Sequence, residues 1–279
     1  MTVSLWDYLR REKKKLEGWL QRVDAEIYGS LLECQKREGF SGSCAEIGVH
    51  HGKSFIPLCV SLKDGEKALA IDIFDDQEAN RDRSGQGDYD VFTTNIDSFG
   101  IGKESVRVIS RSSEDVSATE ILESVGEVRF FSVDGGHWSS IVQNDLALAE
   151  QTLTPDGVIA LDDYCRPDWP DVTYGYALWQ NSTESDIVPF AAGSNKLYLC
   201  RQSRVKTYQE ALRGSSFLAA VFVKRYSFED RSIDCYRDSY HRRDEENKSA
   251  AMLGSLSLFR PSAFVFLKRL RWRIARTFG

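Results

Sequence analysis

The chain has 279 residues, 42% of them hydrophobic, and a formal net charge of −6 at pH 7. A sequence of this length and composition can bury one large core, so we expect one main α/β domain with appendages. The acidic balance argues against nucleic-acid binding through overall basicity and favours a small or neutral substrate. We therefore expect no nucleic-acid partner.

The cysteines and the N-terminal residues bear on localisation. The 6 cysteines are widely scattered and form no CxxC pair, which favours reduced thiols. Residues 10–15 are charged, so the N-terminus lacks the apolar stretch of a signal peptide, and no run is long enough to cross a bilayer. These features predict a cytoplasmic protein.

The hydrophobic pattern predicts an alternation of helices and strands. Apolar residues recur at roughly helical spacing from about 5 to 32, which predicts one amphipathic helix leading into the domain. Strands are expected near 44–48, 67–73, 106–109, 128–133 and 158–161, and helices near 52–62, 88–98 and 139–153, with a further helix start at 112–115. This order is typical of a parallel sheet.

Two later features complete the predicted fold. Thr154-Pro155-Asp156-Gly157 should end the last of these helices, because proline cannot continue a helix and glycine accepts the turn. Residues 187–190 and 196–200 are expected to form a closing pair of strands at an antiparallel edge. The prediction is a Rossmann-like, doubly wound α/β sheet, mostly parallel with an antiparallel edge strand.

We divide the chain into an N-terminal helical segment, 1–40, a main domain, 41–203, and a C-terminal extension, 204–279. Residues 229–248 are dominated by charged and polar side chains and should be mobile or ordered by a partner. Residues 263–279 alternate apolar and basic side chains without an acid, which is typical of a basic amphipathic helix. That helix could lie on the inner face of a membrane, or pack on the domain or a neighbouring subunit; we expect a homo-oligomer.

A glycine turn follows the first predicted strand. Gly48 and Gly52 bracket three residues at a strand-to-helix junction, where the backbone can approach a ligand closely. Glu46 disfavours a phosphate there, and the spacing lacks one residue of the P-loop pattern. Asp72 ends the second strand, a position from which an acid typically binds a ribose diol. A nucleoside cofactor is indicated; a tight turn without ligand is the alternative.

Acids and a histidine follow two later strands. Because parallel strands share one carboxyl edge, Gly48, Asp72, Asp134 and Asp162 should face one cleft, and Asp163 directly follows Asp162. Three carboxylates suit Mg²⁺ or Mn²⁺, with waters completing the shell. His137 has a titration range suited to accepting a proton. Alternatively, Asp162 orients His137 without a metal, and Asp163 caps a turn.

These motifs together resemble those of a known enzyme family. Glu-x-Gly-x-x-x-Gly at 46–52, the acid at Asp72 and the strand order are similar to class I S-adenosylmethionine-dependent methyltransferases. Asp134-Gly135-Gly136-His137, residues 153–159 and Asp162-Asp163-Tyr164 resemble the bacterial branch containing macrolide-sugar and rhamnosyl O-methyltransferases. The resemblance covers about 40 to 200.

The resemblance implies S-adenosylmethionine as cofactor and a role for each matching residue. Glu46, Gly48 and Gly52 would border its methionine part, Asp72 would bind the ribose, and Ser112 or Ser113 would lie near adenine. Asp134 is expected to contact the cofactor and to be catalytic together with His137. The loop at 110–113 departs from the family's usual glycine-acid-serine run. In the related sugar enzymes the acids matching Asp134, Asp162 and Asp163 hold a metal, and the histidine matching His137 is the general base.

We therefore expect an S-adenosylmethionine-dependent O-methyltransferase acting on a sugar hydroxyl of a glycoside, nucleotide-sugar or surface polysaccharide. A metal-dependent enzyme for a catechol-like small natural product is one alternative, and a non-catalytic cofactor-binding or interaction protein of the same fold is another. Aromatic residues follow the acids and could stack on a sugar or pack within a lid: Tyr164, Trp169, Tyr174, Tyr176 and Trp179. His50 and His51 are expected to have no chemical role.

Overall fold

The computed structural model describes residues 3–228 and 231–238. Its helices are α1 (Leu5–Arg10), α2 (Arg22–Arg37), α3 (Phe55–Val60), α4 (Tyr89–Ser98), α5 (Ala118–Val125), α6 (Ser139–Thr152), α7 (Pro170–Ser182), α8 (Val205–Arg213) and α9 (Ser216–Ala220). Its strands are β1 (Ser43–Ile47), β2 (Ala68–Asp72), β3 (Val106–Ser110), β4 (Val128–Val133), β5 (Leu153–Leu161), β6 (Ile187–Ala192), β7 (Leu197–Arg201), β8 (Phe222–Phe228) and β9 (Arg231–Tyr236).

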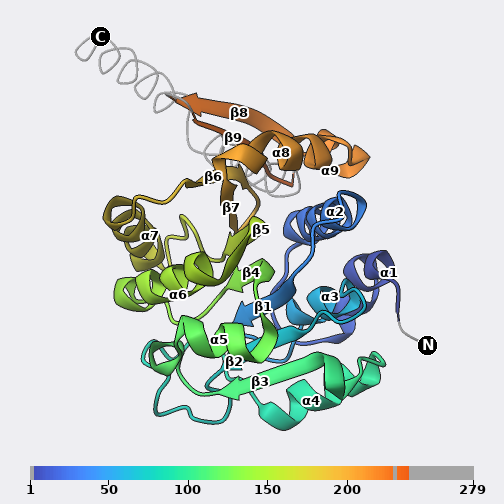
Figure 1. Cartoon of the computed structure of the whole chain (residues 1–279), viewed down its shortest axis with the longest axis vertical. Helices are drawn as coiled ribbons and strands as arrows, with labels where there is room; N and C mark the ends of the chain where they lie inside the picture. Colours follow the sequence, from blue (N-terminus) through green and yellow to red (C-terminus); the bar gives the residue numbers. More distant parts are fainter. Residues whose placement is uncertain (1–2, 229–230, 239–279) are drawn as a thin grey trace, which may run out of the picture. The chain divides into compact units, whose positions relative to one another are not determined.

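The described strands form one sheet in the order β3-β2-β1-β4-β5-β7-β6-β9-β8 (Figure 1). Strands β3, β2, β1, β4 and β5 are mutually parallel, and β7 pairs antiparallel with both β5 and β6. The predicted doubly wound, mostly parallel α/β fold is confirmed. Chain order reverses between β1 and β4, and in such sheets the crevice at this switch point takes the ligand.

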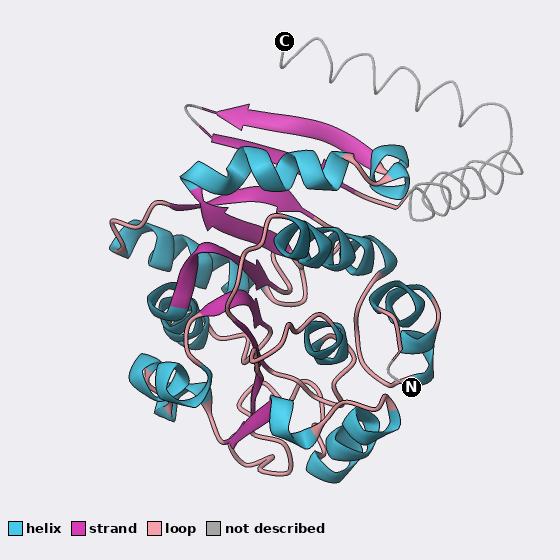
Figure 2. Cartoon of the chain, turned by 45° about the vertical axis from the view of Figure 1, so that its right-hand side comes forward, coloured by secondary structure: helices cyan, strands magenta, loops and turns pink. Residues whose placement is uncertain are grey.

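Helices cover both faces of the sheet, as Figure 2 shows. One core cluster joins the sheet to residues of α1, α2, α3, α4 and α8, and a second joins it to residues of α5, α6 and α7. The central strands β1 and β4 are buried along their whole length, so their sequences are largely apolar instead of alternating. Their carboxyl ends are thereby fixed at the middle of the sheet.

The N-terminal segment differs from the prediction of one helix over 5–32. Helix α1 ends at Arg10, a 3₁₀ turn spans Glu12–Lys15, and α2 begins only at Arg22. Gly18 has φ +118°, and the carbonyls of Leu16 and Gly18 accept hydrogen bonds from Lys53 Nζ at 2.9 and 2.8 Å. The helix breaks because these carbonyls bind a side chain from another element.

The segment 154–157 also differs from its prediction as a stop between helix and strand. Helix α6 does end at Thr152, but β5 begins at once, at Leu153. The ladder to β4 pairs Val128 with Leu153 and Phe130 with Val158, so residues 154–157 form an irregularity within the strand. A Cβ on Gly157 would lie 3.1 Å from the Val128 carbonyl, so the chains approach closely where the register shifts.

Residues 205–237, assigned above to the C-terminal extension, contribute α8, α9, β8 and β9. Strand β9 pairs parallel with β6, and β8 pairs antiparallel with β9, so the sheet continues beyond the predicted closing pair. Residues 231–236, part of the segment expected to be mobile or partner-ordered, form β9. The basic segment 263–279 lies outside the described residues. Among the described helices, none is long and apolar enough to cross a membrane.

Candidate functional site

A cavity of about 460 Å³ opens at the carboxyl ends of β1, β2, β3 and β4. Its walls come from loops that are distant in sequence: 18–21, 47–50, 71–73, 79–85, 111–114, 134–137, 162–163 and 195–196. Several of the expected site residues line it, namely Gly48, Asp72, Ser112, Ser113, Asp134, His137, Asp162 and Asp163. The topology therefore gathers them at the switch point of the sheet.

Gly48 allows β1 and β4 to meet at this edge. Its φ is +80°, and a Cβ there would lie 1.8 Å from the carbonyl oxygen of Asp134. Only glycine fits that approach. Gly52, also with positive φ, lies outside the cavity wall; its N–H donates to the Val49 carbonyl at 2.7 Å and closes the turn.

Glu46 is completely buried on β1 and does not line the cavity. Its Oε1 accepts a hydrogen bond from the Ser132 hydroxyl at 2.8 Å, and that hydroxyl accepts one from Tyr28 at 2.9 Å. Within the part of the chain that the structure describes, Oε2 has no hydrogen-bond partner. Burial raises the pKa of Glu46 to about 7. The expected contact of this carboxyl with the methionine part of a cofactor stays a prediction.

Asp72 and the two serines border the cavity on its β2 and β3 side. The Asp72 carboxylate accepts hydrogen bonds from the backbone N–H groups of His50 at 2.8 Å and Phe74 at 2.6 Å. Burial raises the pKa of Asp72. Ser112 accepts the N–H of Glu114 at 3.3 Å, which begins a 3₁₀ turn. Asp72 thus fixes the backbone of the glycine loop by accepting the N–H of His50, and it also lines the cavity.

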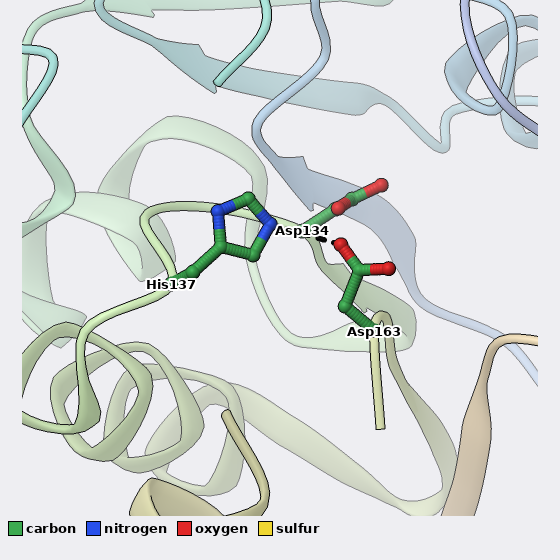
Figure 3. Close-up of side chains that lie close together, drawn as sticks. All are labelled: Asp134, His137 and Asp163. Carbon is green, nitrogen blue, oxygen red and sulfur yellow. Dashed lines mark hydrogen bonds and ion pairs between the residues drawn. The ribbon is translucent and has the colours of Figure 1, made fainter. Parts of the chain in front are cut away.

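His137 lies between the carboxylates of Asp82 and Asp163 on the opposite wall, toward β4 and β5. Figure 3 shows the side of the ring that faces Asp163. Its Nε2 is 2.9 Å from Asp163 Oδ2, and its Nδ1 is 2.7 Å from Asp82 Oδ2. The ring stacks on Trp169, with centroids 4.1 Å apart. Burial opposes protonation, but the bonds to Asp163 and Asp82 raise the pKa of His137 to about 10. The imidazole is thus held as a cation in this arrangement.

Three side chains converge closely enough to share a metal ion. Asp134, His137 and Asp163 each offer one ligand atom, and these atoms lie within 4.8 Å of one another. Figure 3 shows the two carboxylates and the imidazole turned toward a common space. Burial and the neighbouring charge of Asp162 raise the pKa of Asp134 well above its usual range. A cation in this space would favour the ionised form of Asp134.

Asp162, the third acid expected at the metal, has different partners. Its Oδ2 is 2.7 Å from the Lys196 ammonium, and its Oδ1 accepts a hydrogen bond from Asn195 Nδ2 at 2.6 Å. Although burial opposes ionisation, the charge of Lys196 lowers the pKa of Asp162. The structure therefore gathers Asp134, His137 and Asp163, and engages Asp162 with Lys196 and Asn195.

Sequence reasoning missed several residues of the cavity. Asp82 comes from the polar stretch after β2, and Asn195 and Lys196 were interpreted only as a turn and the start of a strand. Trp19 belongs to the break in the N-terminal segment that the apolar periodicity concealed. No sequence signal marks Asp82. A lysine directly before a buried strand, as Lys196 is, could have been recognised as a partner for the acids.

The two adjacent histidines of the glycine loop stack on each other, with ring centroids 3.8 Å apart. His50 has φ +48° and lines the cavity, and its ring lies 5.4 Å from that of Trp19. His51 is buried; its Nδ1 lies 3.7 Å from Glu17 Oε2, and among residues 3–228 and 231–238 neither ring nitrogen has a hydrogen-bond partner. That these histidines have no chemical role stays a prediction.

The aromatic residues after the acids divide into two groups. Tyr176 and Trp179 are buried in the core, and Trp179 donates its ring N–H to Glu150 at 2.9 Å. Trp169 lines the cavity through its stack on His137, and Tyr174 is 57% exposed on α7. Only Trp169 of these is placed to contact a molecule bound in the cavity.

Comparison with known proteins bears on the class of enzyme. Residues 45–164 match the model of a family described as a methyltransferase domain. A comparison with curated protein sequences gives no match. Among solved structures, the O-methyltransferase NovP is similar, with a TM-score of 0.50 and 15% identity over 65% of this chain and 81% of NovP.

Two further solved structures are similar at lower scores. CalS11, described as a TDP-rhamnose 3′-O-methyltransferase of calicheamicin biosynthesis, has a TM-score of 0.47 and 14% identity, covering 70% of this chain and 91% of its own. An O-methyltransferase from Bacillus cereus has a TM-score of 0.48 and 16% identity, covering 70% and 88%. The family match identifies residues 45–164 as a methyltransferase domain, which confirms the expected class of enzyme, and the similarity to NovP shows that the fold is shared.

Proposed function

We propose that the chain transfers the methyl group of S-adenosylmethionine to a hydroxyl oxygen of a sugar, on a glycoside, a nucleotide-sugar or a polysaccharide. The observation that carries the proposal is the meeting of Asp134, His137 and Asp163 in the same cavity as the glycine loop at Gly48. Such a cavity can hold a cofactor and place proton-transfer groups beside its reacting end.

The cofactor is assigned to the β1, β2 and β3 side of the cavity. The backbone at Gly48 can approach the methionine part, because no side chain stands there. Asp72 lines the cavity and would accept hydrogen bonds from the ribose hydroxyls, and Ser112 and Ser113 border the space that we assign to adenine. Asp134 then lies where the cofactor side and the acid cluster meet.

The proton of the acceptor hydroxyl is assigned to His137. Asp82 binds Nδ1 and orients the ring, so that Nε2 faces the space beside Asp163. Because the two carboxylates favour the imidazolium, the ring must lose its proton before it can act as a base. Once neutral, it would accept the hydroxyl proton at Nε2, and Asp82 would stabilise the resulting charge.

The donor set of the acid cluster fits a divalent metal. Asp134 and Asp163 supply two carboxylates, and Mg²⁺ or Mn²⁺ is commonly held by one or two carboxylates with waters and substrate. Such an ion, when bound, would lower the pKa of the acceptor hydroxyl. Asp134 and Asp163 would hold it, while His137, oriented by Asp82, remains free for the proton.

The sugar acceptor rests on the resemblance of residues 134–137 and 162–164 to sugar O-methyltransferases. Polar groups at the cavity wall, among them Arg166 and Asn195, suit an acceptor with several hydroxyls. The alternative to a sugar acceptor is a catechol-like acceptor, and the two are compared in the same assay. Methylation of catechols, with no turnover of rhamnosides or nucleotide-sugars, would overturn the sugar assignment and leave the O-methyl transfer intact.

The first experiment is a calorimetric titration of the full chain with S-adenosylmethionine and S-adenosylhomocysteine, with and without Mg²⁺. Asp72→Ala serves as the binding-deficient control. We expect micromolar binding that weakens in the control, followed by methyl transfer in a panel of sugar and catechol acceptors. Absence of binding under every condition would contradict the proposal. Binding without turnover on any acceptor would favour a non-catalytic cofactor-binding protein.

A further inference from the structure

We propose that Lys196 is a positioning residue that withdraws Asp162 from the metal centre, leaving a site of two carboxylates, Asp134 and Asp163. This inference deepens the proposed function and rests on it. The three neighbouring acids therefore have different roles. Asp134 and Asp163 would bind the divalent ion from solution, and Asp162 would pair with the ammonium group of Lys196.

Lys196 is buried beside two of these acids, Asp162 and Asp134. The residue is 3% exposed and directly precedes β7, and its carbonyl accepts the N–H of Gly193 at 2.8 Å across a tight turn. Its ammonium lies 2.7 Å from Asp162 Oδ2 and 3.5 Å from Asp134 Oδ2, without an aligned hydrogen bond to either. Both contacts are therefore ion pairs within the protein interior.

The neighbouring Asn195 occupies the other oxygen of Asp162. Its Nδ2 donates to Asp162 Oδ1 at 2.6 Å and to Asp163 Oδ1 at 2.8 Å, and its backbone N–H donates to Asp24 Oδ2 at 3.1 Å. Both oxygens of Asp162 thus face fixed donors of the chain. Asp163 keeps Oδ2 toward His137 and the shared space, so it is placed to bind an ion there.

The charges around Lys196 explain why it stays in place. Besides Asp162, the charge of Lys196 acts on three other acids: Asp24 on α2, Glu46 on β1 and Asp134 after β4. A buried carboxylate without a partner is strongly unfavourable, so removal of the ammonium would leave Asp162 in need of another cation. A divalent ion could supply that charge, which predicts competition between Lys196 and the metal for Asp162.

The test is Mn²⁺ binding, followed by calorimetry on the full chain, because this readout does not require activity. Asp163→Asn should lower the affinity about tenfold or more, as expected when a ligand is lost. Lys196→Met should raise the affinity about tenfold or more, because Asp162 becomes free and a positive charge is removed. Melting temperature with and without Mn²⁺ shows in parallel whether each variant is folded.

The deciding variant is the double substitution Lys196→Met with Asp162→Asn. It removes one charge of each sign, so the net charge of the site is unchanged, and position 162 carries no acid that has lost its partner. We expect its Mn²⁺ affinity within about threefold of the original chain. Asp162→Asn alone is unsuitable, because the freed ammonium could turn to Asp134 and weaken binding indirectly.

The outcomes separate this inference from the proposed function. An affinity of the double variant as low as that of Asp163→Asn would show that Asp162 binds the ion, and would overturn the role of Lys196. Binding of Mn²⁺ by the Lys196→Met variant and not by the original chain would support competition between Lys196 and the metal for Asp162. Absence of Mn²⁺ binding by both the original chain and this variant would overturn the inference. Cofactor binding and methyl transfer, measured separately, decide the proposed function in each case.

Discussion

The two walls of the cavity are built in different ways. The cofactor wall depends on the backbone: Gly48 lets β1 pass against β4, and Asp72 accepts two N–H groups of the neighbouring turns. The acid wall depends on side chains from separate loops, with His137, Asp82 and Asp163 meeting only after folding. The cofactor wall should therefore be most sensitive to substitutions that add atoms near the backbone. The acid wall should be most sensitive to substitutions that change a side-chain charge.

The largest effect is expected at the cofactor wall, for Gly48→Ala. The new Cβ would overlap the carbonyl of Asp134 and would also need a left-handed φ, so we expect a loss of about 4 kcal/mol or more in the free energy of unfolding. Urea denaturation measures it. The matched control is Gly126→Ala, which has a similar φ of +74° but open space around it and should lose only about 1–3 kcal/mol. Equal losses would contradict the close approach.

At the acid wall, His137→Ala should slow turnover by about 100-fold or more while leaving cofactor affinity unchanged. The reason is that the imidazole is assigned to the proton and not to the cofactor. Steady-state kinetics and calorimetry with S-adenosylhomocysteine provide the two measurements. Asp82→Asn should have a smaller effect, roughly tenfold on kcat, because the imidazole remains while its orientation and the stabilisation of its positive charge are weakened. Unchanged turnover in His137→Ala would remove that role.

Asp72→Ala tests whether a side chain of the cofactor wall also contributes to the binding of S-adenosylmethionine. We expect the dissociation constant for S-adenosylmethionine to rise about tenfold or more, since a ribose contact and two acceptors for the glycine loop are lost together. Asp72→Asn is the conservative partner, because it keeps one acceptor oxygen and should weaken binding less. An unaltered dissociation constant in both variants would take Asp72 out of the cofactor site.

The smallest effect concerns Asp145 on α6, which is buried next to Gly135 of the cavity wall. Burial raises the pKa of Asp145 to about 7, and a Cβ on Gly135 would lie 2.5 Å from its Oδ2. A raised pKa means that the native protein favours the neutral acid. Stability from this group is present below about pH 4 and is lost as pH rises toward and through about 7.

Asp145→Asn should remove that pH dependence. Relative to the original chain, the variant should gain roughly 1 kcal/mol in unfolding free energy as the pH rises from 6 to 7. Urea denaturation at several pH values measures the difference. Parallel curves for the two proteins across this range would contradict the assignment of the titration to Asp145.

The sequence by itself determined the local parts of this protein. The strand, glycine turn and helix around Gly48 follow from residues close together in the chain, and so do the buried strand before Asp134 and the later acids. The mostly parallel sheet then followed from the order of elements, because parallel strands share their carboxyl edge. The gathering of Asp134, His137 and Asp163 in one cavity was predictable for that reason.

Only the tertiary structure decided which partner each side chain takes. Lys53 breaks the apparent N-terminal helix by binding the carbonyls of Leu16 and Gly18, and Lys196 pairs with Asp162. Periodicity describes which face of an element is buried, but it carries no information about which distant charge will meet a buried carboxylate. Such pairings are set by the packing of loops from separate elements, where a charge cannot remain buried without a partner.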